Sequence, residues 1–424
     1  MMTLYAGNRR GTRRRAGVAL AIILLVGAVA PDAAFGQWVQ WGGPDGDFKV
    51  EADGLAGSWP EDGPPRLWSR ELGEGYSAIL ADGEQLFTLY RAEENEIVIA
   101  LNAKTGKTLW EHKYLSAPHK GHVEMFGNGP RGTPLLSGDR LYTIGVAGKM
   151  HCLDRADGKV YWSHDLWGDD FKGNVLEHGY SSSPIAYNNT VIVLVGGEDA
   201  SIVAFDKYDG RVVWKKQSFG NSYSTPKIIN VGGEDQLVTF MATEIVGLDP
   251  DDGELEWKLP HENQWKQNVC PPIWDGKDTL FFSAPEAGSK AVRLTRNGDK
   301  TDVEELWSTR KIQFYHVTAV RDGDYVYGSS GTQSPCFLSA VNMKTGKVAW
   351  RERGFAKATT LFAGGKLIIL DEDGNLAIAT PSPDQLTVHS KASLLKKVAW
   401  TVPTLLGKTL FVRDKTNILA LDLG

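Results

Sequence analysis

The sequence predicts an all-β fold, an eight-bladed β-propeller of four-stranded antiparallel blades that is closed by pairing of the N- and C-terminal strands. Three observations lead to it. One phrase (a short apolar strand, a glycine turn, then a tryptophan) recurs along the chain, glycine-rich dipeptides separate short apolar strands, and no segment after residue 36 keeps a helical period. The copies recur at about 45 residues, which suits a blade of four short strands.

Residues 1–36 precede the fold. Arginines between positions 9 and 15 are followed by an apolar run over 16–30, and small residues lead up to Gly36. This order is typical of a secretory signal peptide with cleavage near Gly36 and Gln37. A membrane anchor is the alternative, but the run is shorter than the ~20 residues of a spanning helix. Since no cysteine precedes Cys152, we expect no lipid anchor at the cleavage site.

The predicted product is therefore periplasmic or secreted, soluble after cleavage and without stable membrane insertion. The paired arginines leave both Sec and twin-arginine export open. Cleavage would remove five arginines and one aspartate, and the formal net charge of −6 would become about −10. An acidic balance of this size argues against nucleic acid as a partner.

The three cysteines, Cys152, Cys270 and Cys336, are widely spaced. They form neither a disulfide framework nor a C-x-x-C metal motif. We expect buried free thiols, although one pair could bridge in an oxidising compartment.

Residues 37–65 are predicted as an N-terminal lead-in and residues 66–424 as the propeller. Five well-formed copies place an acidic or amide residue, a turn glycine and a tryptophan in fixed order. They run 100–110, 152–162, 204–214, 247–257 and 340–350. A stretched copy covers 294–307, and a worn copy at 376–388 has prolines in place of the glycine turn and lacks the tryptophan.

The last copy, 418–422, stops before its tryptophan, and the strand around Trp68 has no repeat strand before it. Joining the two ends completes eight copies, which is how a radial array of sheets closes without leaving exposed ends. Within each blade, Asp-Gly, Asn-Gly or Thr-Gly dipeptides join the third and fourth strands, because tight hairpins need residues that accept positive φ.

The recurrent tryptophans have a structural role in this prediction. A buried indole covers roughly 150–250 Å², so each ring is expected to dock against the Ala- or Gly-containing strand of the adjacent blade and fix the angle between blades. The predicted docking residues are Trp68, Trp110, Trp162, Trp214, Trp257, Trp307 and Trp350.

The repeated phrase resembles the tryptophan-docking motif of the PQQ-like (quinoprotein-type) propeller superfamily, over about residues 38–424. Gln40-Trp41-Gly42-Gly43-Pro44 is similar to the lead-in of exported members. The superfamily includes dehydrogenases that hold pyrroloquinoline quinone (PQQ) and calcium in the channel, and non-catalytic propellers of the BamB type. The resemblance implies the fold more firmly than a function, because many activities share this scaffold.

Function is expected at the channel mouth, where loops from the outer strand of one blade reach the inner strand of the next. Counting back three residues from a recurrent proline, whose place is taken by Ala319 and Thr360 in two blades, gives one mouth residue per blade. They are Tyr76, Arg131, Ser181, Tyr223, Val269, His316, Lys357 and Trp400, with Tyr180, Asn268 and Tyr315 beside them. Such an aromatic and polar mouth suits a small anionic or carbohydrate-like ligand or a peptide loop. The alternative is that these residues only line a water-filled opening.

Two further readings of the mouth concern catalysis. The long loop at 111–130 carries His119, His122 and Glu124, which would serve a metal or a hydrolase or lyase, but no regular element fixes these side chains. The resemblance to quinoproteins implies Glu177 and Asn268 as calcium ligands, and Arg131 and Lys357 as partners of the quinone carboxylates.

Against the dehydrogenase, the vicinal cysteine pair of many such enzymes is absent, and no aspartate follows Tyr315 and His316 as a base. The extra loop length that covers the quinone is missing too. We therefore favour an exported, non-catalytic binding or scaffold propeller without a cofactor that recognises a protein, a peptide or a small polar ligand. A PQQ- and calcium-dependent dehydrogenase acting on alcohols or sugars is the alternative.

Overall fold

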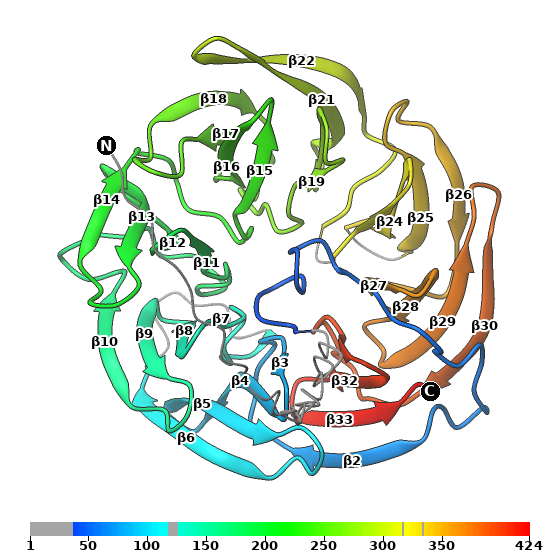
Figure 1. The fold of residues 1–424 in the computed structure, drawn as a ribbon. Helices are drawn as coiled ribbons and strands as arrows, with labels where there is room; N and C mark the ends of the chain where they lie inside the picture. Colours follow the sequence, from blue (N-terminus) through cyan, green and yellow to red (C-terminus); the bar gives the residue numbers. More distant parts are fainter. Residues whose placement is uncertain (1–36, 118–125, 316–317, 333–334) are drawn as a thin grey trace, which may run out of the picture. The chain divides into compact units, whose positions relative to one another are not determined.

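Eight sheets stand side by side around a central axis (Figure 1). The structure, a computed structural model, describes residues 37–117, 126–315, 318–332 and 335–424. The predicted signal peptide, residues 1–36, lies outside this part. Each blade has four antiparallel strands running from the axis outward, and one sheet gains a fifth, parallel strand. The predicted eight-bladed all-β propeller is confirmed.

The strands of blades 1 to 4 follow in chain order from inner to outer edge. They are β3 (Leu80–Asp82), β4 (Gln85–Ala92), β5 (Asn95–Asn102), β6 (Thr108–Leu115); β7 (Leu135–Ser137), β8 (Arg140–Ile144), β9 (Lys149–Asp154), β10 (Val160–Asp165); β11 (Ile185–Tyr187), β12 (Thr190–Gly197), β13 (Ala200–Asp206), β14 (Val212–Lys216); β15 (Lys227–Val231), β16 (Glu234–Phe240), β17 (Glu244–Leu248) and β18 (Leu255–Pro260).

Blades 5 to 8 repeat the pattern, and the last takes its outer strand from the N-terminal side. Their strands are β19 (Ile273–Trp274), β20 (Thr279–Ala284), β21 (Gly288–Asn297), β22 (Lys300–Thr309); β23 (Val320–Asp322), β24 (Tyr325–Ser330), β25 (Phe337–Asn342), β26 (Val348–Glu352); β27 (Thr359–Ala363), β28 (Lys366–Leu370), β29 (Asn375–Pro381), β30 (Leu386–Ser393); β31 (Thr404–Leu406), β32 (Thr409–Arg413), β33 (Asn417–Asp422) and β2 (Arg66–Glu71).

The two chain ends close the ring as predicted. Strand β2 pairs antiparallel with β33, and Trp68 lies opposite Ala420. At the joint between blades 8 and 1, the fully buried Arg413 donates to the carbonyl of Leu89 (2.8 Å) and to the hydroxyl of Thr88 (3.0 Å). The guanidinium therefore has buried hydrogen-bond partners in blade 1, which ties the two blades together.

Near the axis, hydroxyl groups link one blade to the next. The backbone N–H of Ala78 donates to Oγ1 of Thr133 (3.2 Å), that of Thr133 to Oγ of Ser183 (3.0 Å), and that of Ser183 to Oγ1 of Thr225 (3.1 Å). Each bond joins the start of one inner strand to the following blade. We call these bonds the hydroxyl belt. Because they lie where the loops of the channel mouth enter the inner strands, they also help to fix the positions of those loops.

At the outer edge, most of the recurrent tryptophans reach into the next blade. The indole N–H of Trp110 donates to the carbonyl of Arg155 (2.9 Å), and a Cβ added to Gly158 would lie 2.5 Å from the ring. Glycine at the turn therefore makes room for the indole. The same bond to the next blade is made by Trp68, Trp162, Trp214, Trp307 and Trp350.

Trp257 departs from the predicted docking. Its indole N–H donates to Oε1 of Gln236 (2.8 Å) in its own blade, and a Cβ on Gly247 would lie 2.2 Å from its Nε1. The next blade offers no turn at the usual place, because its β21–β22 hairpin has ten residues in each strand. That hairpin leans on blade 4, where Gln236 donates to Oγ1 of Thr301 (2.6 Å).

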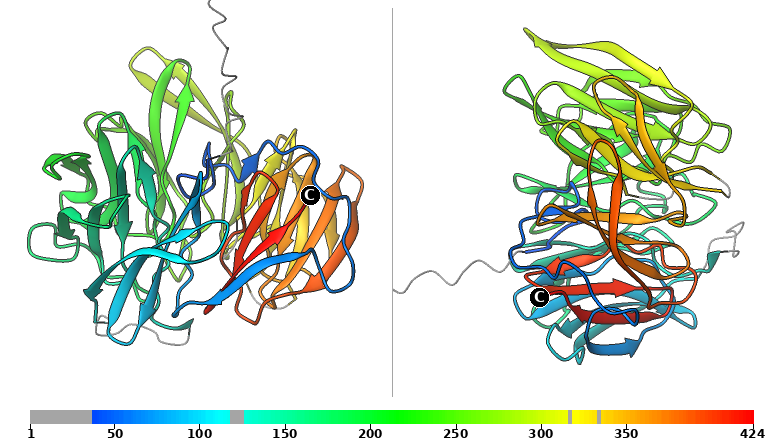
Figure 2. Two further views of the ribbon diagram at one scale, coloured as in Figure 1. Left: turned by 60° about the horizontal axis from the view of Figure 1, so that its bottom comes forward. Right: turned by 90° about the vertical axis from the view of Figure 1, so that its right-hand side faces the viewer.

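The lead-in crosses one opening of the channel (Figures 1 and 2). Trp38, fully buried, forms a bridge with Ala81 of blade 1, and the carbonyl of Val39 accepts the N–H of Leu136 in blade 2. On the far side of the channel, β1 (Lys49–Val50) pairs parallel with β27 of blade 7. The segment spans the channel and is built into the propeller.

The lead-in also supplies a tryptophan where the repeat lacks one. Blade 7 carries Val388 in place of the tryptophan, and Trp59 of the lead-in is buried at 9% exposure in the core cluster that also contains residues of blade 7. The backbone N–H and carbonyl of Trp59 both bond Oγ of Ser390 in β30 (2.9 Å each), while the N–H of Ala56 donates to the carbonyl of Leu423 in blade 8 (2.5 Å). The segment before β2 thus bridges the outer edges of blades 7 and 8.

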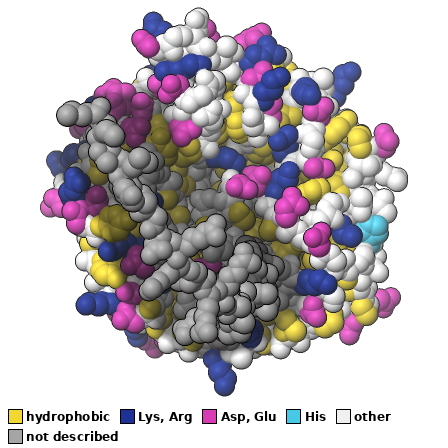
Figure 3. All heavy atoms as spheres, viewed as in Figure 1, with side chains coloured by type: hydrophobic (Ala, Val, Ile, Leu, Met, Phe, Trp, Pro, Cys, Tyr) yellow, Lys and Arg dark blue, Asp and Glu magenta, His cyan; other side chains and the backbone are white. Residues whose placement is uncertain are grey.

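The face crossed by the lead-in carries acidic and basic side chains intermixed around the rim (Figure 3). The three cysteines are free and buried. No helix with the length and hydropathy needed to cross a bilayer occurs in the described ranges.

Candidate functional site: an aromatic cavity at the channel mouth

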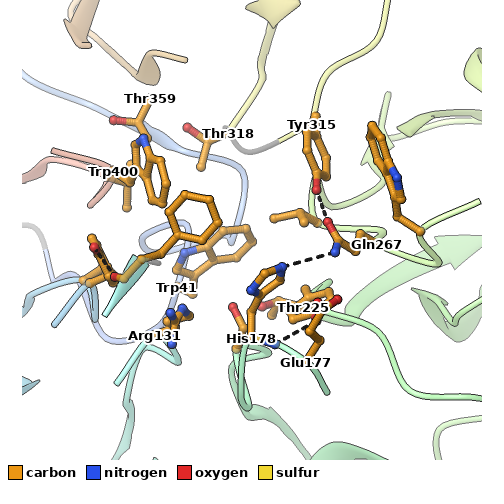
Figure 4. A pocket seen from close by; sticks show the side chains of 18 of the residues that line it. Trp41, Arg131, Glu177, His178, Thr225, Gln267, Tyr315, Thr318, Thr359 and Trp400 are labelled. Atoms are coloured by element: carbon orange, nitrogen blue, oxygen red, sulfur yellow. Dashed lines mark hydrogen bonds between the residues drawn. The ribbon is translucent and has the colours of Figure 1, made fainter. Parts of the chain in front are cut away.

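A cavity of about 610 Å³ lies on the axis, among the loops that lead into the inner strands (Figure 4). This volume is typical of sites for small ligands, which run from about 300 to 1,000 Å³. Its lining comes mainly from the connections between consecutive blades and from the lead-in, with Thr332 from the β24–β25 loop and Thr359 from the start of β27. The lining residues are Trp41, Tyr76, Ala78, Phe126, Arg131, Glu177, His178, Ser181, Tyr223, Thr225, Trp265, Gln267, Val269, Tyr315, Thr318, Thr332, Thr359, Trp400 and Val402.

Trp41 of the lead-in closes the inner end of the cavity. Its ring meets Phe48 edge to face at 4.8 Å between centroids. Gly42 and Gly43 follow it with φ of 86° and 84°, a conformation that favours glycine. These two residues turn the chain sharply and hold the indole across the channel, so the cavity is blind on the lead-in side.

One wall is a cluster of aromatic rings from three connections. Trp400 lies 5.6 Å from Tyr76 and 5.2 Å from Phe126, between ring centroids. The hydroxyl of Tyr76 donates to the carbonyl of Phe126 (2.5 Å), which fixes the segment before β7 against the segment before β3.

Arg131 lies beside this cluster. Its guanidinium lies 5.6 Å from the Tyr76 ring centroid and donates to the carbonyls of Gly127 (2.9 Å) and Gly129 (3.3 Å). Burial lowers the pKa of Arg131, although the phenols of Tyr76 and Tyr223 oppose that shift. The side chain nonetheless stays charged at neutral pH, because the ordinary pKa of an arginine side chain lies far above 7.

The opposite wall is a polar chain of three residues. Tyr315 donates its hydroxyl to Oε1 of Gln267, and Gln267 donates its amide to Nε2 of His178 (3.2 Å), as Figure 4 shows. The backbone N–H of His178 donates to the hydroxyl of Tyr223 (3.3 Å). The connections before β11, β15, β19 and β23 are therefore linked through side chains that face the cavity.

The tyrosines of the site keep their protons. Burial raises the pKa of Tyr76 and of Tyr223 to about 12. Both phenols therefore serve as neutral hydrogen-bonding groups at any physiological pH.

The structure brings most of the predicted mouth residues together. Tyr76, Arg131, Ser181, Tyr223, Val269 and Trp400 all line the cavity, as do Tyr315 and Glu177. His316 lies outside the described residues, as do His119, His122 and Glu124.

Three predicted residues are placed elsewhere. Tyr180 is fully buried and donates its hydroxyl to the carbonyl of Leu194 (2.7 Å). Asn268 is fully buried too, and its amide donates to the carbonyls of Met241 (2.7 Å) and Ala242 (3.3 Å). Neighbouring residues in an extended loop point to opposite sides, so the side chains next to Ser181 and Val269 enter the packing between blades.

Lys357 lies behind the aromatic wall. Its ammonium group lies 5.8 Å from the Trp400 ring centroid and forms an ion pair with Glu372 (3.4 Å). Lys357 therefore supports the wall from outside the cavity and has its charge balanced.

The calcium set implied by the quinoprotein resemblance does not fit these residues. Glu177 lines the cavity, but the side-chain oxygen of Asn268 accepts a bond from Asn263 (3.0 Å) and its amide is bonded to the backbone. Both ends of this side chain are used in holding its loop. In the part of the chain that the structure describes, no three His, Cys, Asp or Glu side chains are grouped to hold a metal ion.

Sequence reasoning missed several lining residues, namely Trp41, Phe126, Trp265 and Gln267. Trp41 carried a signal, since the paired glycines after it mark a sharp turn. The other three lie in long connections outside the repeated phrase, where spacing gives no register.

The sequence profile of the family described as outer membrane protein assembly factor BamB matches residues 94–352. The BamB protein of Yersinia pestis is 20% identical over 367 residues, which are 84% of this chain and 77% of that protein. The dehydrogenase subunit of the quinone alcohol dehydrogenase of Gluconobacter oxydans is 27% identical over 54% of this chain, and the match spans 33% of that subunit.

Solved structures give the same picture of the fold. BamB from Moraxella catarrhalis superposes with a TM-score of 0.56 at 18% identity, covering 84% of this chain and 97% of that one. Quinohemoprotein alcohol dehydrogenase from Comamonas testosteroni gives 0.66 at 12% identity, covering 92% and 81%. At these identities the structural likeness shows the fold alone.

Proposed function

The chain belongs to the family of the outer membrane protein assembly factor BamB, and on that premise we propose that it is an exported, non-catalytic binding propeller. It acts in the periplasm after removal of residues 1–36 and recognises a protein partner through the face on which the aromatic cavity opens. The loops of that face form the recognition surface, and the repeats below hold them in place.

The observation that carries the proposal is the construction of the cavity. Its lining is contributed by the connections between blades all round the ring, and its inner end is closed by Trp41. Polar side chains there are committed to fixing the loops, as in the contact of Tyr315, Gln267 and His178. A preformed concave surface of aromatic and polar groups suits binding with little reorganisation.

The alternative, a PQQ- and calcium-dependent dehydrogenase, is disfavoured by the same geometry. Asn268 would have to break its bonds to Met241 and Asn263 to reach a metal beside Glu177. Such buried bonds to an amide are costly to leave unmade.

Site-specific photo-crosslinking in cells that export the protein tests the proposal. A photoreactive residue at Gln264, exposed between β18 and β19, is expected to capture one defined partner. The same residue at Lys104, exposed in the turn between β5 and β6, serves as the matched control and is expected to capture none.

Equal capture at the two positions would contradict the assignment of the face. The purified protein is also to be mixed with PQQ and calcium and assayed for reduction of a dye by alcohols. Turnover that depends on Glu177 would overturn the non-catalytic proposal.

A further inference from the structure

The two cations nearest the aromatic wall differ in how their charge is balanced. Lys357, behind Trp400, forms an ion pair with Glu372 at 3.4 Å. Arg131, which lines the cavity, donates only to the neutral carbonyls of Gly127 and Gly129, and no carboxylate among the described residues lies within ion-pair distance of it. The cavity therefore contains a positive charge that no described side chain pairs with directly, and the carboxylates of Glu74 and Glu96 act on it only from beyond ion-pair distance.

The guanidinium still has hydrogen-bonding capacity. It carries five N–H donors, and its two bonds to carbonyls use one on each terminal nitrogen. Those two bonds and the Tyr76 ring fix the plane of the group. A planar, fixed arginine is suited to a carboxylate, which it can bond with two parallel N–H groups.

The cavity next to Arg131 is lined by aromatic rings. Arg131 lies over the ring of Tyr76, and Tyr76, Phe126 and Trp400 form the aromatic wall. Trp41 closes the end (Figure 4). Aromatic groups gain from offset or edge-on contact with such rings in addition to the area they bury. Glu177, the carboxylate of the lining, is exposed to solvent. Its negative charge therefore disfavours an anionic group of the ligand beside it, and the position that attracts such a group is next to Arg131.

We propose that this cavity binds a carboxylate carried on an aromatic body, with Arg131 receiving the carboxylate and the rings of Trp41, Phe126 and Trp400 receiving the body. The inference rests on the proposed function, because it names the ligand chemistry of the same recognition face. This chemistry is found at the C terminus of a polypeptide that ends in an aromatic residue, and also in small aromatic acids. The blind end at Trp41 is compatible with both, since either can enter from one side.

The test is titration calorimetry, supported by the fluorescence of the cavity tryptophans, on the full mature protein. The probes are N-acetylphenylalanine, its amide, and a hexapeptide ending in phenylalanine with a free or amidated C terminus. We expect each free acid to bind at least about 10-fold more tightly than the matching amide, as a charge-assisted pair to arginine implies.

The decisive variant is Arg131→Gln, which keeps hydrogen-bonding capacity but removes the charge. In it the difference between acid and amide is expected to fall to within about 2-fold. Arg211→Gln, an exposed arginine in the β13–β14 turn, is the matched control and is expected to retain the difference. Arg131→Lys is the control for unfolding as the cause of a lost preference, since it keeps the charge and should retain part of the preference for the acid.

Equal binding of acid and amide, a preference that persists in Arg131→Gln, or no binding of any probe would overturn the proposal. The probes also separate the two sources of the carboxylate. A hexapeptide acid that binds about 10-fold more tightly than N-acetylphenylalanine identifies a chain terminus, and equal affinity identifies a small acid. If every probe fails while Gln264 still captures its partner, the proposed function survives and only the ligand chemistry falls.

Discussion

The joint between blades 1 and 2 and the joint between blades 4 and 5 use the same residue type in different ways. At the first, the indole of Trp110 crosses to the next blade and bonds the carbonyl of Arg155 above Gly158. At the second, the indole of Trp257 stays in its own blade and bonds Gln236. Contact with blade 5 is made instead through Gln236 and Thr301 of the long hairpin.

The difference shows that tryptophan docking depends on the turn of the next blade as much as on the tryptophan itself. Blade 2 ends its third strand in a short turn whose glycine leaves room for the ring. Blade 5 extends the corresponding hairpin, β21–β22, so its turn lies too far out to receive one. The side chain stays buried in both cases, at 8% exposure for Trp110 and 5% for Trp257, but only the first couples two blades directly.

The largest expected effect comes from removing each tryptophan. Trp110→Ala and Trp257→Ala should each lower the free energy of unfolding by about 3–5 kcal/mol, since both rings are buried. Hydrogen exchange should distinguish the two variants. Trp110→Ala should speed exchange in the receiving turn of blade 2, around Gly158, whereas Trp257→Ala should speed it within blade 4, around Gln236. If both variants loosen the following blade equally, the comparison fails.

A smaller effect is expected at the residue opposite the tryptophan. In the paired strand this position is Ala100 in blade 1 and Gly247 in blade 4. Gly247→Ala would place a methyl group 2.2 Å from Nε1 of Trp257 and should cost about 1–3 kcal/mol by overpacking, measured by denaturant unfolding.

The control for this substitution is Gly57→Ala, where an added Cβ meets nothing within 4 Å. It is expected to change the stability by less than about 0.5 kcal/mol. A neutral Gly247→Ala would mean that the indole of Trp257 can swing outward like the others.

The smallest effect concerns pH. At the joint between blades 4 and 5, His261 packs between Phe240 (5.7 Å) and Phe282 (5.0 Å), and burial lowers its pKa to about 4. Between pH 6.5 and 4 the unfolded chain therefore binds a proton that the folded chain does not, and stability falls as the pH drops. From pH 7 to 5 this should cost about 1–2 kcal/mol.

His261→Leu removes the titrating group and is expected to flatten this dependence, as chemical denaturation at several pH values would show. A variant with the full wild-type slope would locate the effect in other groups.

The sequence recurrence was sufficient to predict the eight blades and their closure, because each copy contains the pattern of its own strands and turns. The sequence also contained an indication that Trp257 differs from the other tryptophans. Gly247 stands where most copies have alanine, and that missing methyl is the space the indole of Trp257 occupies. What recurrence could not supply is the direction of the ring, which depends on the length of the neighbouring hairpin.

The cavity was predictable only in part for a similar reason. Counting back from the recurrent proline or its equivalent position places Tyr76, Arg131 and Trp400 at the mouth, and all three line the cavity, since each lies in a loop that leads into an inner strand. Trp41 was not assigned to the site, since its position follows from the path of the lead-in over blades 1, 2 and 7. That path is set by pairings distant in sequence, such as β1 with β27.

Closure through β2 and β33 also orders the events of folding. The outer strand of blade 8 is synthesised before blades 1 to 7, and its partner arrives only with residues 417–422, after those blades. Until then the nascent ring exposes an unpaired strand at each end, and such edges template aggregation. The pairing spans almost the whole chain, so it belongs to the slow, non-local class of contacts. Loss of the last few residues would therefore leave β2 unpaired in an otherwise complete propeller and favour its aggregation.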